Sequence, residues 1–329
     1  MMPLLSVQNL RTYFRTRKGW LKAVDGVSFD LEEGESLGIV GESGCGKTTI
    51  ALTIMRTLPP NAQVMDGKIV LEGQDTLPIP DQEHRRLRWS KVSMIFQAAM
   101  NSLNPVFRVG DQLVDVYINH RKVTKDEARK RVAELFELVG LDKKRMNNYP
   151  HEFSGGMKQR TIIAMSLLCH PRLIIADEPT TALDVVVQDQ ILSEIKDLQQ
   201  ELKFSLIVIS HDISVISETC DRAIVMYAGR IFEEADIIST IKDPHNPYTI
   251  SLMSSFPSIS GPIRKLVSIP GAAPNLVNPP PGCLFYPRCP IGKEACAKET
   301  PPYVQVADRH STLCHFPHEA NKAGFLQVR

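Results

Sequence analysis

The sequence GESGCGKT at residues 41–48 constrains the fold most, because it matches the whole phosphate-binding pattern G-x-x-x-x-G-K-[ST]. The apolar run LGIV precedes it and TTIALTIMRTL follows it, so the pattern lies between a predicted strand and a predicted helix. Glycines let successive backbone N–H groups turn toward one point, where they and the helix N-terminus can bind phosphates. The motif therefore predicts a strand–loop–helix unit that binds a nucleoside triphosphate.

The side chains of this loop have separate predicted roles. Lys47 provides a positive charge for the β- and γ-phosphates, and the hydroxyl of Thr48 is placed to ligate Mg²⁺. We expect the remaining contacts to the nucleotide from the other residues of the loop and the first turn of the helix, which are Gly41, Ser43, Gly44, Cys45, Gly46 and Thr49.

A second group of motifs lies in the middle of the chain. FSGGMKQR occupies residues 153–160, and LLCHPRLIIADEPTTALD occupies residues 167–184. The apolar run LIIAD predicts a buried strand that ends in Asp177, a carboxylate suited to hold Mg²⁺ through water, with Glu178 beside it. A further apolar run, SLIVIS, ends just before His211.

These motifs resemble, in order and spacing, those of the ATPase subunits of ABC transporters. The matching features are the phosphate-binding loop, the serine-glycine-glycine signature, the Asp-Glu pair, the Ala182-Leu183-Asp184 turn and the histidine after the next strand. The resemblance covers residues 4 to about 255. With the C-terminal part included, the chain is most similar to the ATPase subunits of dipeptide and oligopeptide permeases.

The resemblance implies a role for each matching residue. Glu178 would be the general base that orients and deprotonates the attacking water, and His211 would lie near the γ-phosphate. Gln97, after the apolar strand in SMIFQ, matches the glutamine that senses Mg²⁺ and contacts the membrane subunit. Phe14 aligns with the aromatic that stacks on adenine, and Tyr13 is the neighbouring candidate.

The signature implies a dimer. In the family it closes over the nucleotide of the opposite subunit in a head-to-tail arrangement, so the site is expected to include Ser154, Gly155, Gly156 and Asp184. The chain has Phe153 and Met157 at the ends of the signature instead of the common leucine and glutamine, a variant that resembles the peptide-permease subgroup.

Composition favours an enzyme that works beside a membrane. The 38 basic and 37 acidic side chains leave a net charge of +1, which provides no basic excess for nucleic acid and argues against an ABC protein of DNA repair or translation. We expect no signal peptide, and no apolar run approaches the ~20 residues of a spanning helix. Any transport must therefore use a path that other chains build.

The expected fold class is α/β, with a P-loop ABC-type core, an antiparallel β layer, a helical subdomain at about residues 100–170 and a small cysteine-rich C-terminal extension. Strands over residues 23–35 lead through Gly34 into the P-loop strand, and residues 223–234 predict a closing hairpin with Gly229 in its turn. Residues 124–127, TKDE, form a capping box for a helix that Gly140 ends. We expect an ATPase domain over residues 1–255 and a separately folded C-terminal domain over residues 256–329.

The C-terminal part is rich in proline and glycine, and it contains four of the seven cysteines, at Cys283, Cys289, Cys296 and Cys314. Disulfides are disfavoured in a cytosolic chain, which favours the interpretation of these cysteines as ligands of a metal ion or cluster. Their spacing, however, lacks the paired C-x₂-C of zinc sites. Chemistry alone leaves zinc, an iron–sulfur cluster and free thiols open. The resemblance to the permease tail implies a [4Fe–4S] cluster. The nearby His310, His315 and His318 are candidate substitute ligands, but we interpret them as solvated side chains that flank the last cysteine.

The sequence is therefore interpreted as an ATP-hydrolysing subunit of a di- or oligopeptide importer, peripheral at the cytoplasmic face of the cell membrane. The expected partners are a second, related ATPase subunit, two transmembrane permease subunits and, indirectly, an external peptide-binding protein, without nucleic acid. Two alternatives stay open. The importer could carry another solute such as nickel, or the chain could be a soluble ABC ATPase whose cluster responds to redox state.

Overall fold

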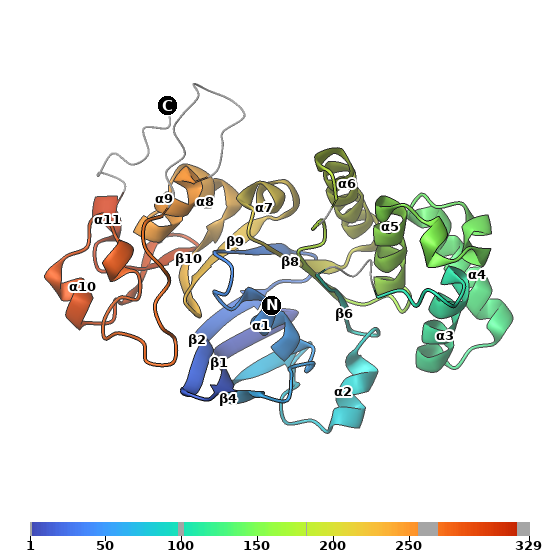
Figure 1. Cartoon of the computed structure of the whole chain (residues 1–329), viewed down its shortest axis with the longest axis horizontal. Helices are drawn as coiled ribbons and strands as arrows, with labels where there is room; N and C mark the ends of the chain where they lie inside the picture. The colour runs from blue at the N-terminus through green and yellow to red at the C-terminus, as the bar shows by residue number, and fades with distance from the viewer. Residues whose placement is uncertain (1, 98–101, 182, 256–268, 321–329) are drawn as a thin grey trace. The chain divides into compact units, whose positions relative to one another are not determined.

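The computed structural model describes residues 2–97, 102–181, 183–255 and 269–320, and the chain divides into two compact units. The first unit comprises Met1–Leu4, Leu31–Ser36 and Glu72–Ile209. The second comprises Leu5–Asp30, Leu37–Leu71 and Ser210–Arg329. Figure 1 shows the elements of both units along the chain. In the part that the structure describes, no helix combines the length and the apolar composition needed to cross a membrane.

The first unit contains a parallel group of strands, in the order β8-β7-β6. Their bounds are β6 (Val92–Ile95), β7 (Leu173–Asp177) and β8 (Ser205–Ser210). All residues of these strands are buried, which is typical of parallel strands covered on both faces. Both β7 and β8 have the bounds that the apolar runs LIIAD and SLIVIS predict.

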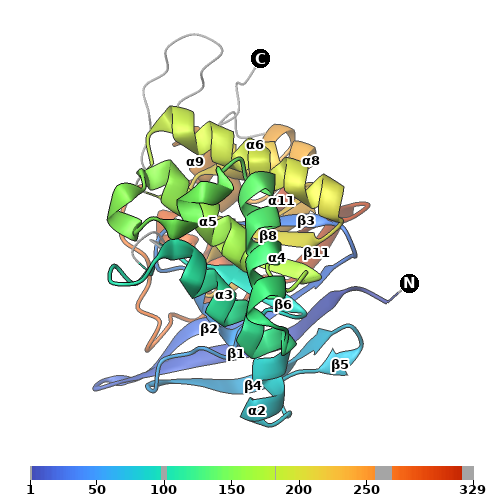
Figure 2. The ribbon, with the colours of Figure 1, turned by 90° about the vertical axis from the view of Figure 1, so that its right-hand side faces the viewer.

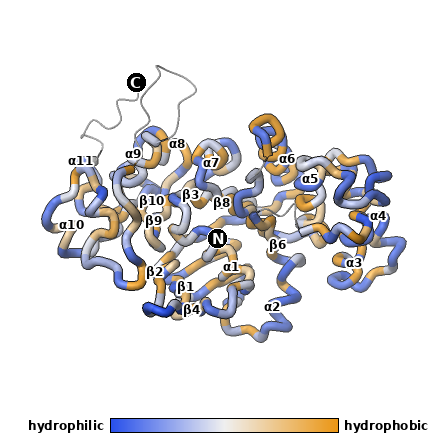
Figure 3. Tube along the Cα trace, in the orientation of Figure 1, coloured by the Kyte–Doolittle hydropathy of each residue, from blue (hydrophilic) through white to orange (hydrophobic). Residues whose placement is uncertain are grey.

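Helices make up most of the rest of the first unit. They are α2 (Asp81–Leu87), α3 (Val109–Arg121), α4 (Lys125–Leu138), α5 (Gly155–Ser166) and α6 (Val185–Leu202), with 3-10 turns η2 (Lys143–Asn147) and η3 (Pro150–Glu152) and a short strand β5 (Gln74–Asp75). Figure 2 shows α3, α4 and α5 packed together. In Figure 3 each of α3 and α4 carries both hydrophobic and hydrophilic segments, as expected for helices with one buried face.

The predicted capping box begins α4. Thr124 Oγ1 accepts a hydrogen bond from the Glu127 backbone N–H at 3.3 Å, and the Glu127 carboxylate accepts one from the Thr124 backbone N–H at 2.8 Å. Gly140 follows the helix with a φ of 69°, which suits glycine because it has no Cβ. Both predicted ends of this helix are therefore confirmed.

The second unit contains an antiparallel layer and a second group of strands. The layer has the order β2-β1-β4, with β1 (Leu5–Thr16), β2 (Gly19–Leu31) and β4 (Ala62–Leu71). The second group includes β9 (Arg222–Tyr227) parallel to β3 (Ser36–Val40) and antiparallel to β10 (Arg230–Asp236). Helices α1 (Lys47–Ile54), α7 (Ile213–Thr219), α8 (Ile237–Lys242) and α9 (Pro247–Ser254) complete this part of the unit. Gly229 lies in the β9–β10 turn with a φ of 82°, as predicted.

The C-terminal segment, defined here as residues 269–320, is ordered around short elements. These are η4 (Tyr286–Arg288), α10 (Glu294–Lys298), β11 (Tyr303–Ala307), β12 (His310–Leu313) and α11 (Pro317–Ala320). Strand β12 pairs antiparallel with β10 and with β11, so the segment extends the edge of the strand group that contains β9 and β3. The preceding part of the predicted tail, residues 256–268, lies outside the described residues.

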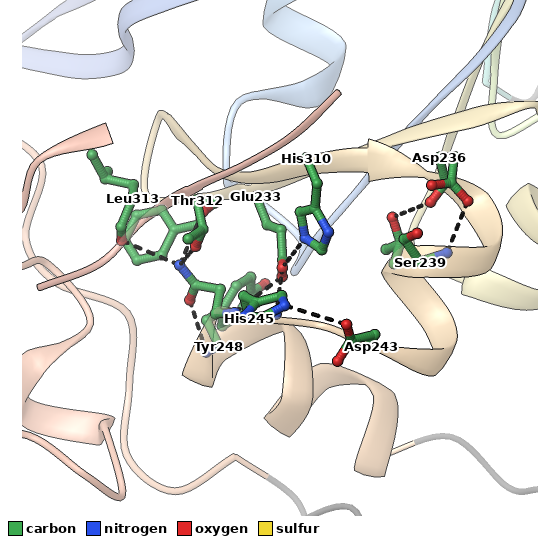
Figure 4. Close-up of polar contacts among 12 residues, drawn as sticks. Glu233, Asp236, Ser239, Asp243, His245, Tyr248, His310, Thr312 and Leu313 are labelled. Atoms are coloured by element: carbon green, nitrogen blue, oxygen red, sulfur yellow. Dashed lines mark hydrogen bonds and ion pairs between the residues drawn. The ribbon is translucent and has the colours of Figure 1, made fainter. Parts of the chain in front are cut away.

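A buried polar network anchors β12 to the unit, as Figure 4 shows. Glu233 in β10 is fully buried, and its carboxylate lies 2.8 Å from His310 Nε2 and accepts the Asn246 backbone N–H at 3.2 Å. The Asn246 side-chain amide donates to Thr312 Oγ1 at 3.0 Å. The interpretation of His310 as a solvated side chain is wrong, because it is only 3% exposed and its ring pairs with Glu233.

Candidate nucleotide-binding site

The phosphate-binding loop lies in the second unit, between the buried strand β3 and helix α1. Gly41, Gly44 and Gly46 all have positive φ angles, at 155°, 79° and 109°. A Cβ on Gly41 would lie 2.1 Å from the Met226 carbonyl oxygen, and one on Gly46 would lie 2.2 Å from the Ala23 carbonyl oxygen. The loop is therefore closely packed on the backbone at both its ends.

Gly41 and Gly44 predict different responses to alanine. Gly41→Ala combines a left-handed backbone with a backbone clash and should destabilise the protein by about 3 kcal/mol or more. Gly44→Ala meets no atom within 4 Å and should cost only about 1 kcal/mol. Thermal and urea unfolding of both full-length variants measures this difference, and equal destabilisation would contradict the described packing.

Lys47 begins α1 at the end of the loop. Its side chain is buried, and Nζ donates to the Gly41 carbonyl at 2.7 Å and to the Glu42 carbonyl at 3.1 Å. Burial raises the pKa of the Cys45 thiol, although Lys47 opposes the shift. A neutral Cys45 adds no negative charge to a loop that would hold phosphates. Ser43 and Thr48 are exposed, and Thr49 is half-buried.

The two aromatic candidates differ in their environment. Tyr13 is buried in β1 and its hydroxyl donates to Asp25 Oδ1 at 2.7 Å. Phe14, the next residue of the same strand, pairs with Ala62 in β4 and is half-buried. Successive side chains of a strand point to opposite faces, so the two rings lie on different faces of the layer. The structure thus gives Tyr13 a structural partner and leaves Phe14 as the aromatic with an accessible ring.

The first unit brings two of the predicted catalytic side chains together. Asp177 ends β7 and is only 1% exposed. The Glu178 carboxylate accepts hydrogen bonds from Gln97 Nε2 at 2.8 Å and from Thr181 Oγ1 at 3.0 Å. Glu178 also has a φ of 47°, a left-handed conformation that is costly for a residue with a Cβ. Its backbone N–H donates to the Ile209 carbonyl at 2.8 Å, which holds this conformation.

The signature residues begin α5. Ser154 is the N-cap, and its Oγ accepts the Met157 backbone N–H at 3.3 Å, while Gly155 and Gly156 form the first turn. Asp184 has the same role at α6, where Oδ1 accepts the Val187 backbone N–H at 3.0 Å. Ala182, in the predicted Ala-Leu-Asp turn, lies outside the described residues. In the second unit, His211 is exposed between β8 and α7.

The four C-terminal cysteines line one pocket. Cys283, Cys289, Cys296 and Cys314 share it with apolar and aromatic side chains that include Phe232, Phe285 and Phe316, and with His315. Each of the four is a free cysteine. Burial raises the pKa of the Cys289 thiol to about 11 and that of the Cys314 thiol to about 12. Over residues 2–97, 102–181, 183–255 and 269–320, no three His, Cys, Asp or Glu side chains are arranged to hold a single metal ion.

Two residues that the sequence motifs do not identify contact the phosphate-binding loop. The Glu42 backbone N–H donates to the Tyr248 hydroxyl at 3.0 Å, and the Glu42 carboxylate pairs with Arg288. These partners lie 206 and 246 positions away along the chain. No local spacing could reveal them. In the sequence, Arg288 is marked only by its position directly before Cys289.

Comparisons with protein families match two parts of the chain. The model described as "ABC transporter" matches residues 24–181, and the model described as "Oligopeptide/dipeptide transporter, C-terminal region" matches residues 232–296. The chain is 46% identical over 321 residues to the dipeptide transport ATP-binding protein DppD of Bacillus subtilis (strain 168), with 95% of each chain covered. It is 43% identical over 318 residues to the oligopeptide transport ATP-binding protein OppD of Escherichia coli (strain K12), covering 96% of this chain and 94% of that protein.

Solved structures of ATP-binding cassettes share the fold. The dimeric cassette MJ0796, in a post-hydrolysis state bound to ADP and phosphate, aligns with a TM-score of 0.64 and 27% identity over 71% of this chain and 98% of that chain. The cbiO1 protein of Clostridium perfringens, part of the transporter complex cbiONQ, aligns with a TM-score of 0.65 and 26% identity over 74% and 92%. The expected mixed α/β fold of ABC ATPases, with parallel and antiparallel strands, is confirmed.

Proposed function

Since the chain belongs to the ATP-binding subunits of oligopeptide and dipeptide ABC transporters, we propose that it hydrolyses ATP to drive the import of di- or oligopeptides. The observation that carries this proposal is identity above 40% along almost the whole chain to proteins named for that transport, including the C-terminal region. The ATPase activity itself follows from the family.

The chain provides side chains that suit the binding of Mg²⁺ and ATP. Asp177 is a buried carboxylate at the end of a parallel strand, and Thr48 is an exposed residue at the start of α1. Carboxylate and hydroxyl oxygens are ligands that Mg²⁺ prefers. Gln97 completes the proposed set of Mg²⁺ ligands. The ion would neutralise charge on the β- and γ-phosphates. Lys47 and the backbone N–H groups of the loop would bind the same phosphates.

We assign the general base to Glu178. Its carboxylate follows the proposed Mg²⁺ ligand Asp177 directly, and hydrogen bonds from Gln97 and Thr181 orient it. It would accept a proton from the attacking water as that water bonds to the γ-phosphorus. His211 would stabilise charge at the γ-phosphate, and Phe14 would stack on adenine.

The proposed assembly is a head-to-tail dimer with a related ATPase subunit. Ser154, Gly155, Gly156 and Asp184 would contact the partner's nucleotide. That a similar ATP-binding cassette is dimeric supports the proposal of a dimer. The dimer would lie at the cytoplasmic face of the cell membrane on two permease subunits that receive peptide from an external binding protein. ATP would close the dimer and hydrolysis would reopen it.

The proposed function predicts the proteins that accompany this chain. Native purification from gently solubilised membranes should recover two membrane-spanning permease subunits and a second ATPase subunit, and the associated external protein should bind peptides. Recovery of the chain alone, or with an external protein that binds nickel but no peptide, would contradict the proposal.

For the C-terminal segment we propose a [4Fe–4S] cluster, with zinc as the alternative. We also propose that residues 256–329 form the domain that holds it and that residues 1–255 form the ATPase domain. The support is that four free cysteines line one pocket whose other walls are largely apolar. In such a cluster each cysteine thiolate ligates a different iron atom, so the four sulfur atoms need not converge on one ion. Thiolate ligation would offset the burial that now favours protonated thiols.

Cys289→Ser tests the cluster. Anaerobically purified protein should contain about four iron atoms per chain, and this variant should lose iron and become protease-sensitive after residue 255. Cys220→Ser is the matched control, because Cys220 is also buried but does not line the pocket. Iron and zinc analysis measures the outcome. Zinc without iron would select the alternative, and no metal in the native protein would reject both.

A further inference from the structure

The P-loop residue Glu42 is held at three points, two of them by groups that lie far away along the chain. Its backbone N–H donates to Tyr248 in α9, and its carbonyl accepts from Lys47. Its carboxylate accepts two parallel hydrogen bonds from Arg288, from Nη1 at 2.7 Å and from Nη2 at 2.8 Å. Bidentate pairs of this kind fix orientation as well as charge.

Arg288 is built into this position rather than resting on the surface. Its side chain is only 6% exposed, against 30% for Glu42. Nε donates to the Pro270 carbonyl at 2.8 Å, Nη1 also contacts the Tyr227 hydroxyl at 3.2 Å, and Nη2 also contacts the Ile269 carbonyl at 3.3 Å. Every N–H of the guanidinium therefore has an acceptor.

We infer that Arg288 is a positioning residue for ATP binding, acting through Glu42 to hold the phosphate-binding loop in its binding conformation. The inference rests on the proposed function, because it concerns the same nucleotide. If the loop is free to leave this conformation, the apparent Kd equals the intrinsic Kd divided by the fraction of time that the loop spends in the binding conformation. Through Arg288, the C-terminal segment thus supports the nucleotide site.

The positioning role of Arg288 predicts an effect on nucleotide binding but not on the hydrolysis step. Arg288 and Glu42 do not supply the proposed base or the Mg²⁺ ligands, so their loss should weaken nucleotide binding and leave the chemical step nearly unchanged. Arg288→Met and Glu42→Gln should each raise the Kd for Mg·ADP about tenfold, equivalent to about 1.4 kcal/mol. In the assembled transporter they should raise KM for ATP by a similar factor while kcat stays within about twofold.

A double-mutant cycle on the full-length chain makes the test specific. Calorimetric titration with Mg·ADP should give the double variant a Kd no weaker than that of either single variant, because both changes break one pair. Arg288→Lys, which keeps the charge but loses the planar fork, should restore only part of the affinity. Lys293→Met is the control, since it breaks an exposed pair with Glu319 in the same segment.

An unchanged Kd for Mg·ADP in Glu42→Gln would overturn the inference. This variant is informative because it leaves the sequence of the C-terminal segment unchanged. Additive losses in the double variant would also overturn it, since they would show that Arg288 acts by general destabilisation. If the unmodified chain bound no Mg·ADP, the proposed function itself would fail instead.

Discussion

Glu178→Gln should lower the rate of ATP hydrolysis by about 10²- to 10⁴-fold and leave ATP bound, because it removes a general base but keeps the size and shape of the side chain. The amide can still hydrogen-bond with Gln97 and Thr181, whose contacts hold the side chain in place. The ATP-bound dimer should therefore persist longer. Phosphate release by the purified transporter complex measures the rate.

Glu201→Gln makes the same chemical change on the exposed face of α6 and should leave the rate within about twofold. Gel filtration in the presence of ATP measures how long the dimer persists. Near-normal turnover by Glu178→Gln would assign the base to another residue.

Lys47→Ala should weaken ATP binding by at least about a hundredfold, since it removes the buried ammonium that lies among the loop carbonyls. Ser154→Arg should spare ATP binding by the isolated chain and block hydrolysis in the complex. A long cation at this N-cap would obstruct closure over the partner's nucleotide, and loss of the cap alone should cost only about 1 kcal/mol.

Two measurements separate loss of ATP binding from loss of hydrolysis. Calorimetric titration of each isolated variant measures ATP binding, and turnover of the complex measures hydrolysis. Lys68→Ala, an exposed lysine of β4, is the control for the loss of one positive charge. If Ser154→Arg abolished ATP binding by the isolated chain, the signature would act on the nucleotide of its own chain, and the proposed dimer geometry would be wrong.

Much of the core fold could be predicted because its signals are local. The run LIIAD has the composition and length of a buried parallel strand, and it forms β7 with those bounds. The capping box at Thr124 needs only residues three apart, and Gly229 needs only the positive φ of a tight turn. Each of these features is decided within a few residues of chain.

Contacts between distant segments could not be predicted. The motifs mark Glu178 and Gln97 separately, but only the folded chain shows the Gln97 amide 2.8 Å from the carboxylate. Likewise, His310 reads as one of several histidines near a cysteine, yet its partner Glu233 lies 77 positions earlier in a neighbouring strand. Spacing patterns carry no signal for such pairs.

The contacts that order the C-terminal segment could not be predicted either. Its proline-rich composition suggests little order of its own, and the cysteines were the expected source of order. The structure adds the pairing of β12 with β10 and the contact of Arg288 with Glu42. The described part of the segment and the phosphate-binding loop therefore belong to the same compact unit.

ATP-dependent peptide uptake tests the central claim most directly. The complete transporter, reconstituted in vesicles with its external binding protein, should accumulate labelled di- or oligopeptide when Mg·ATP is supplied on the side of this subunit. Uptake should fall to background in the complex that carries Glu178→Gln in place of the unmodified chain. Rapid ATP hydrolysis without peptide accumulation, or equal uptake by the Glu178→Gln complex, would contradict the account.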